Sequence, residues 1–434
     1  MKTKLLLITL LFATMPAVNA QNRERDYLKK VFANLEKIES ATYYVANESW
    51  QPGDSTALSI LHGFIKEYNH PIDSTIGASY VSLDAKDTTK LNFCYDGNVR
   101  VEAYHDNKKL VIDDFTFKPL PFRLVRPPFF NFAKNIIKYA LTTDDNITIE
   151  LKDEGNDYYF KLTINEEQQV EFFGKAFHMP LPPFDIGNTT SIYELWINKS
   201  DNLPFKERRE MSHDISVSTC SNLQINKLNI RDFNINDYFP KDYETVKYSD
   251  LHKKSGDSPS TSGLTGKKAP GWILENIDGQ SLSLANCKSK VILINFTGIG
   301  CGACQAAVPF LKKLKELFSN EEFDLIAIES WSHNASAIRN YAKRKDLNYT
   351  ILNATNEVIK QYQTGGAAPF FFILDQKRII RKIIRGYSTE MQSKNYYEQT
   401  VYLPFLVSAI QHSTSTITES RISKRKSHTK RHNS

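Results

Sequence analysis

The stretch VILINFTGIGCGAC, residues 291–304, decides the fold of the second half of this chain. It opens with the short apolar run Val291–Phe296, which is typical of a buried strand. A helix-prone segment, residues 305–311, follows the cysteines. Cys301 is then expected at a helix N-terminus, where unpaired N–H groups and the helix dipole stabilise a thiolate. Cys304 lies one turn further on, close enough to close a disulfide, so this setting predicts dithiol redox chemistry.

Metal binding is the main chemical alternative for this cysteine pair. A structural zinc site needs four ligands, and no second Cys-x-x-Cys is present. His428 and His432 have ligand-like spacing but lie in a basic tail, where we expect a solvated role. His333 follows a strand that ends near Glu329, and we interpret it as a surface histidine outside the site. Without a phosphate loop or a Ser-His-Asp pattern, we predict no metal and no cofactor.

Strands and helices alternate from Ala269 onward. We expect strands at 272–274, 291–296, 323–328, 349–352, 370–374 and 379–384, and helices at 304–318, 335–345 and 356–362. Such alternation predicts a central sheet covered by helices, and therefore an α/β domain.

Several motifs in order make residues 265–412 similar to the TlpA-like thiol–disulfide oxidoreductases of the thioredoxin superfamily. They are the opening Gly266–Pro270, the hairpin Asp278–Leu284, the active-site strand and helix from Asn295 to Pro309, and the segment from Gly365 to Asp375. The resemblance implies a thioredoxin-like fold. It also implies an enzyme that exchanges its dithiol with the disulfides of substrate proteins and works with a redox partner that the sequence does not identify.

The same resemblance assigns roles to single residues. Cys301 is the nucleophile that forms a mixed disulfide with the substrate, and Cys304 resolves that intermediate. Pro369 is expected in the cis form, which only X–Pro bonds adopt at low cost. The backbone at Ala368 is expected to pair with an extended segment of the substrate.

This chain departs from the family pattern around the dithiol. Asn295 stands where many thioredoxins carry a buried Asp, and Ala307 stands where relatives in this branch carry a Glu. Gly300 replaces the tryptophan that usually precedes the first cysteine. We therefore expect proton transfer through water. Because Gly302 and Ala303 between the thiols are uncharged, we predict a reductase rather than a strong oxidant.

Residues 41–240 have a different sequence pattern. Short alternating runs separated by turn residues predict an antiparallel sheet. Helical periodicity over residues 23–38 places Leu28, Val31 and Leu35 on one face. A second short helix is expected over 129–141.

This first region resembles the LolA-like carriers of lipoproteins and other lipophilic ligands. The resemblance rests on Tyr95–Asn98 at a hairpin, Tyr193–Asn198, Leu203–Lys206 and the closing Asp232–Pro240. It implies a curved half-barrel of antiparallel strands with helices inside, and a hydrophobic cavity. Aromatic residues make up 12% of the chain and suit such a cavity, but they suit a plain core equally. The alternative function is therefore a protein that binds a lipophilic ligand or polypeptide here, with the redox domain accessory.

The chain begins with a pattern that predicts export. Lysines, an apolar run and Val18-Asn19-Ala20 within residues 1–20 are typical of a cleavable secretory signal peptide. We therefore expect a soluble periplasmic protein. Part of the net charge of +6 lies in the Ser/Thr-rich tail, so charge indicates no nucleic-acid partner. We favour a solvated tail over one that contacts an acidic membrane surface.

At 434 residues the chain is long enough for two domains. The linker between them is rich in Ser, Gly and Lys and has little to bury. We divide the chain into a signal peptide (1–20), a LolA-like β-rich domain (21–244), a flexible linker (245–264), a thioredoxin-like domain (265–412) and a basic disordered tail (413–434).

Three further cysteines are isolated in the sequence. Cys94 and Cys220 could form a bridge within the first domain or remain two buried free thiols. Cys287 is expected to be structural rather than reactive.

Overall fold

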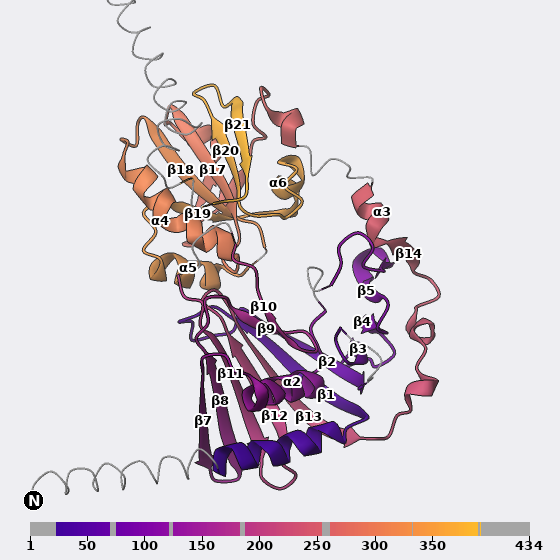
Figure 1. The fold of residues 1–434 in the computed structure, drawn as a ribbon. Helices are drawn as coiled ribbons and strands as arrows, with labels where there is room; N and C mark the ends of the chain where they lie inside the picture. The colour runs from indigo at the N-terminus through magenta and orange to yellow at the C-terminus, as the bar shows by residue number, and fades with distance from the viewer. Residues whose placement is uncertain are drawn as a thin grey trace, which may run out of the picture. The chain divides into compact units, whose positions relative to one another are not determined.

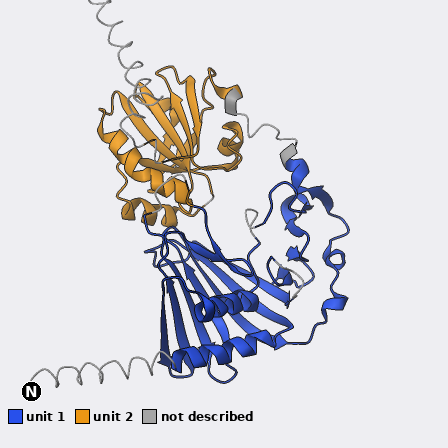
Figure 2. Ribbon diagram, viewed as in Figure 1, with its two compact units in different colours: residues 1–180, 187–256 blue, residues 181–186, 257–434 orange. Residues whose placement is uncertain are grey.

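The computed structural model describes residues 23–69, 75–120, 125–182, 187–253, 261–331, 333–388 and 391. The chain divides into two compact units: unit 1 comprises residues 1–180 and 187–256, and unit 2 comprises residues 181–186 and 257–434 (Figure 2). The predicted signal peptide and the predicted basic tail lie outside the described residues. None of the described helices is long and apolar enough to cross a membrane.

Unit 1 is built on a twelve-stranded sheet in the order β14-β6-β5-β4-β3-β2-β1-β13-β12-β11-β8-β7 (Figure 1). Neighbouring strands pair antiparallel, except that β14 and β6 are parallel. The strands are β1 (Ser40–Trp50), β2 (Ser59–Tyr68), β3 (Ser79–Asp84), β4 (Leu91–Tyr95), β5 (Arg100–Tyr104), β6 (Lys109–Asp113), β7 (Ile147–Glu154), β8 (Asp157–Ile164), β11 (Ser191–Asn198), β12 (Leu203–Glu210), β13 (Ile215–Ile225) and β14 (Glu244–Lys247). A separate hairpin joins β9 (Val170–Phe172) and β10 (Ala176–His178). The predicted mostly-sheet region is confirmed, whereas its half-barrel curvature stays a prediction.

Two helices pack against this sheet in one hydrophobic core. The first covers residues 23–36, and the second is α2 (Phe129–Thr142). Leu28, Val31 and Leu35 are buried together with the apolar face of α2, as the helical periodicity predicted. Alternate residues of β11 are buried in the same core, because side chains on a strand point to opposite faces in turn.

A buried carboxylate lies at the N-terminus of α2. Glu67 on β2 is completely buried and accepts a hydrogen bond from the hydroxyl of Tyr43 at 2.8 Å. It also accepts hydrogen bonds from the backbone N–H groups of Phe130 at 3.2 Å and Asn131 at 2.9 Å. Burial raises the pKa of Glu67 to about 7, although these donors and the charge of Lys134 oppose the shift.

We expect Glu67 to make unit 1 less stable as the pH rises. Its pKa is about 7 in the fold against 4.5 for an ordinary glutamate, so the folded state binds the proton more tightly. The resulting stabilisation is complete at low pH and is lost as the pH rises through the folded pKa, by about 3 kcal/mol in all. Glu67→Gln should flatten the dependence of the unfolding free energy on pH, measured by urea titrations between about pH 5 and 8. An unchanged slope in the variant would contradict this assignment.

Regular secondary structure continues into the segment that the sequence predicted as a linker. Part of the predicted linker forms β14, which pairs with β6, and α3 (Tyr248–Lys253). The physical reason is that β6 would otherwise leave its edge N–H and C=O groups unpaired. The predicted start of the linker at residue 245 is therefore wrong, because residues 244–253 form a strand and a helix.

The isolated cysteines carry no disulfide. Cys94, Cys220 and Cys287 are all free thiols, so the bridge between Cys94 and Cys220 is not formed. Burial raises the pKa of all three, most strongly for Cys94 and Cys220. They are accordingly poor nucleophiles near neutral pH, because the thiolate is the reactive form.

Unit 2 has a five-stranded sheet in the order β19-β18-β17-β20-β21. β17, β18 and β19 run parallel, and β20 and β21 each pair antiparallel with the preceding strand in this order. Its elements are β15 (Ile273–Glu275), β16 (Ser281–Ser283), β17 (Val291–Thr297), α4 (Gly302–Glu316), β18 (Phe323–Glu329), α5 (Ala335–Arg344), β19 (Thr350–Asn353), α6 (Asn356–Gln361), β20 (Phe370–Leu374) and β21 (Ile380–Arg385). Apart from β16, which was predicted only as part of a hairpin, these bounds lie within two residues of the predicted ones. The predicted thioredoxin-like architecture is confirmed.

The central strand β17 is buried along its whole length. Val291 and Leu293 pack on one face of the sheet with α4, whereas Ile292, Ile294 and Phe296 pack on the other face. A strand buried on both faces reads as an unbroken apolar run, which explains the sequence of residues 291–296. This strand holds the turn before Cys301 at the end of the sheet.

Candidate active site

Cys301 and Cys304 lie at the start of α4, one short turn after β17. Cys301 is the N-cap residue of α4, and its Sγ accepts a hydrogen bond from the N–H of Cys304 at 3.2 Å. The two sulfurs form a disulfide between Cα atoms 5.2 Å apart. Cys301 is 7% exposed and Cys304 only 1%. An incoming sulfur therefore reaches Cys301 before Cys304.

The loop before β20 lies beside this disulfide. The Ala368–Pro369 peptide bond is cis, as expected, and the next residue, Phe370, pairs with Phe296 at the end of β17. The carbonyl oxygen of Ala368 is 3.8 Å from Sγ of Cys301. The fold thus brings together the candidate site residues that the sequence singled out, across a separation of 67 residues.

Trp331 joins the two loops of this site. It follows β18, and its ring lies so close to Gly298 that a Cβ atom there would come within 2.5 Å of the ring carbon Cδ2. The indole N–H donates a hydrogen bond to the carbonyl of Gly366 at 2.8 Å. The side chain is nevertheless 41% exposed. Trp331 therefore presents an aromatic surface next to the turn before Cys301 and the loop before Pro369.

A buried acid orders the loop that carries Trp331. Glu329 is fully buried and accepts hydrogen bonds from the backbone N–H of Trp331 at 3.1 Å and of His333 at 3.2 Å. The Nδ1 atom of His333 lies 2.9 Å from the same carboxylate. The interpretation of His333 as a surface residue was wrong, because its side chain is only 18% exposed. Sequence reasoning missed Glu329 and Trp331 because the only signal was an acid at the end of a buried strand.

The two positions where relatives carry a relay acid are buried in this chain. By the alternation of strand side chains, Asn295 lies on the same face of β17 as Leu293, which packs with Ala307 of α4. Neither Asn295 nor Ala307 has a group that transfers protons at neutral pH. The Oδ1 atom of Asn295 has no hydrogen-bond donor among the described residues. It is a buried acceptor of the kind that water commonly satisfies.

The described part of the chain contains no group of three or more His, Cys, Asp and Glu residues placed to hold a metal ion. His428 and His432 lie outside the described residues. What the site offers chemically is a dithiol at a helix N-terminus, a neighbouring backbone carbonyl and an exposed aromatic ring.

Comparison with known proteins finds similarity over the part of the chain that holds this site. The Redoxin family profile matches residues 264–400. The chain is 25% identical over 135 residues to the thiol-disulfide oxidoreductase ResA of a Bacillus cereus strain, which covers 31% of this chain and 77% of that protein. It is 24% identical over 132 residues to ResA of Bacillus subtilis (strain 168), which covers 30% of this chain and 73% of that protein. A solved structure of a thiol-disulfide oxidoreductase from Bacteroides fragilis NCTC 9343 matches with 25% identity and a TM-score of 0.26, over 28% of this chain and 92% of that one.

These comparisons confirm the resemblance predicted for the C-terminal region. Residues 264–400 carry a Redoxin domain, and the enzyme class predicted from the sequence is the class named for the curated relatives. The family match lies in the same part of the chain as the dithiol. The LolA-like resemblance of unit 1 stays a prediction.

Proposed function

We propose that this chain, whose residues 264–400 carry a Redoxin domain, is an exported thiol–disulfide oxidoreductase that reduces disulfides in substrate proteins. The observation that carries the proposal is the Cys301–Cys304 disulfide at the N-terminus of α4, with Cys301 as the more exposed sulfur. Export rests on the leader-like composition of residues 1–20, and we propose the periplasm as the compartment.

The reaction follows from the order in which the two sulfurs are reached. In the reduced protein, the Cys301 thiolate attacks one sulfur of the substrate disulfide and the other substrate sulfur leaves as a thiolate, which takes up a proton. Cys304 then gives up its proton and attacks Cys301 in the mixed disulfide, and the second substrate sulfur leaves. Two electrons pass to the substrate, and the Cys301–Cys304 bond of the structure remains. A dithiol partner must reduce that bond again by the same exchange.

The surroundings of Cys301 support binding of an extended substrate segment. The backbone of Ala368, held beside Cys301 by the cis bond to Pro369, offers hydrogen-bonding groups in the manner of strand addition. Trp331 supplies an exposed apolar ring beside the turn that precedes Cys301. In that turn this chain has Gly300, where a tryptophan usually precedes the first cysteine. We assign Ala368 and Trp331 to substrate binding and Pro369 to positioning of that loop.

The reduction potential of the Cys301/Cys304 couple tests the direction of the reaction. The residues between the thiols are Gly302 and Ala303, which carry no charge, and the described site contains no basic side chain bonded to either sulfur. We expect a potential near that of thioredoxin, about −270 mV, and catalysed reduction of insulin disulfides by the purified, reduced protein. The potential is measured by equilibration with glutathione or dithiothreitol buffers. A value near about −120 mV would instead assign the protein as an oxidant.

Ligand binding by unit 1 is a second candidate function. The observation that favours it is a cavity of about 190 Å³ between the sheet and the segment that leads into α2. It is smaller than the roughly 300–1,000 Å³ of pockets for drug-sized ligands, so it supports a small ligand better than the lipid or polypeptide of a lipophilic carrier. Mass spectrometry of the gently purified protein would detect a retained lipid, and none is expected in this cavity.

A further inference from the structure

We propose that the cavity in unit 1 binds a small amphiphile, a molecule with an apolar body and a primary amine at one end, with the amine against the carboxylate of Glu207. This inference does not depend on the dithiol. The cavity volume is about 190 Å³. Because an apolar cavity of about 150 Å³ holds benzene, the fitting molecule has roughly six to ten non-hydrogen atoms.

Residues in two rows across the sheet form the floor of this cavity. Tyr43, Ile65, Ser82 and Phe93 are successive register partners on β1, β2, β3 and β4 and give a row that is apolar apart from Ser82. Asn47, Ser218 and Glu207 are successive partners on β1, β13 and β12 and give the polar row. Tyr43 and Asn47 are four positions apart on β1, so both rows lie on one face of the sheet.

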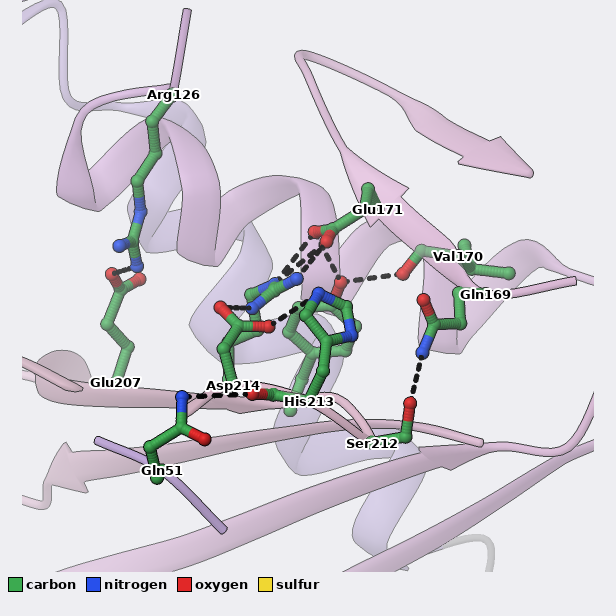
Figure 3. A network of polar contacts seen from close by, with 11 residues as sticks. Gln51, Arg126, Gln169, Val170, Glu171, Glu207, Ser212, His213 and Asp214 are labelled. Carbon is green, nitrogen blue, oxygen red and sulfur yellow. Dashed lines mark hydrogen bonds and ion pairs between the residues drawn. The ribbon is translucent and has the colours of Figure 1, made fainter. Parts of the chain in front are cut away.

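Glu207 presents an unsatisfied acceptor at the polar end of the cavity. It is 3% exposed, and its Oε1 atom accepts a hydrogen bond at 2.8 Å from Arg126, which reaches toward it from the segment before α2 (Figure 3). The hydroxyl of Ser218 donates its single proton to Oδ1 of Asn47 at 2.8 Å. Oε2 of Glu207 is left without a donor in the described residues. Burial raises the pKa of Glu207, while Arg126 opposes that shift. A ligand that donates a hydrogen bond to Oε2 would satisfy this buried atom.

The remaining walls fit an apolar body. The rings of Tyr80 and Phe93 stack with their centroids 5.2 Å apart, and Phe129 also lines the cavity. The hydroxyl of Tyr80 is already used, because it donates to the carbonyl of Arg126 at 2.9 Å. The hydroxyl of Tyr43 is likewise bonded to Glu67. These side chains therefore offer the ligand ring surfaces rather than further polar groups.

The charge of the head group follows from the same contacts. An anionic head would be repelled by Glu207, whereas an ammonium group would gain a charge-assisted hydrogen bond and contact with aromatic faces. Arg126 is the opposing cation, but its side chain is 43% exposed and its guanidinium is already paired with Glu207.

Calorimetric titration of the full chain with 2-phenylethylamine tests the proposal. The matched probes are 2-phenylethanol and phenylacetate, which keep the aromatic ring, stay within the size limit and change the head group. We expect the amine to bind at least about tenfold more tightly than either, and Glu207→Gln to weaken its binding by at least about tenfold. Ser82→Leu, which fills the cavity without touching Glu207, should abolish binding even if Glu207→Gln fails to fold.

Two results would overturn the proposal. One is that the amine binds no more tightly than the acid, or not at all. The other is that folded Glu207→Gln or Ser82→Leu protein retains full affinity. Cys301→Ser is the control for the redox site, and it should bind the amine with unchanged affinity. Failure of disulfide reduction would therefore leave this inference standing, and failure of amine binding would leave the redox proposal standing.

Discussion

Cys301→Ser is expected to reduce the rate of disulfide reduction at least about a thousandfold, because it removes the nucleophile and leaves no second accessible thiol in the site. Cys304 cannot substitute for it, since Cys304 is almost fully buried behind Cys301. The measurement is the rate of insulin reduction by the purified protein with a dithiol reductant in excess. Cys304→Ser should still form the mixed disulfide through Cys301, but it should not resolve it. The mixed disulfide should therefore accumulate, and intact-mass spectrometry would detect it.

Cys287→Ser is the matched control for these variants. Cys287 lies in the same unit, and its Sγ is 3.4 Å from the carbonyl oxygen of Ser283, to which it donates a hydrogen bond. Burial raises its pKa, which keeps it protonated and unreactive at neutral pH. Its replacement should leave the rate unchanged. A Cys301→Ser protein that still reduces insulin, or a Cys287→Ser protein that does not, would contradict the assigned site.

Arg209→Met should destabilise unit 1 by about 3 kcal/mol or more, because it leaves acidic groups unpaired in a largely buried place. Arg209 forms a bidentate ion pair with Glu171 and donates to Asp214 at 2.8 Å. The hydroxyl of Tyr193 donates to the carbonyl of Val170 at 2.6 Å and lies 3.2 Å from Oε2 of Glu171. Without the guanidinium, the Glu171 carboxylate keeps only part of this network. The measurement is the free energy of unfolding by urea.

Lys29→Met is the control for the loss of a positive charge in unit 1. Lys29 pairs with Asp26 at 3.0 Å, but both side chains are largely exposed. Its replacement should change the unfolding free energy by no more than about 0.5 kcal/mol. If Arg209→Met cost no more than Lys29→Met, the buried network would not stabilise the sheet. Arg209→Lys should lower the unfolding free energy by an intermediate amount, because lysine keeps the charge but loses the bidentate geometry.

The fold of unit 2 could be predicted closely because its signals are local. The apolar run at 291–296 and the alternation around it set the strands, and helix periodicity set α4 and α5. In unit 1 the sheet was predicted as a class, but its twelve-strand order was not. Pairing of β1 with β13 joins segments that are far apart in the chain, and the sequence of neither strand identifies the strand with which it pairs.

The burial of charged residues on β12 could not be predicted from the sequence. Its sequence, LPFKERRE, reads as a polar strand that faces water on one side. The structure turns Glu207 and Arg209 toward the interior, where each has a partner from another segment. A buried charge is tolerated only when it is paired, and the partners Arg126 and Glu171 lie tens of residues away along the chain.

The sequence by itself determined the dithiol: two cysteines at a strand-to-helix turn are local neighbours, and covalent spacing alone brings their sulfurs within reach. Its resemblance to a known family pointed to Pro369 and Ala368. Only the tertiary structure decided that Trp331 and Glu329 adjoin this site and that Glu207 opens into a cavity. The physical reason is that these contacts form through space between strands, so they depend on the register of the sheet rather than on neighbours along the chain.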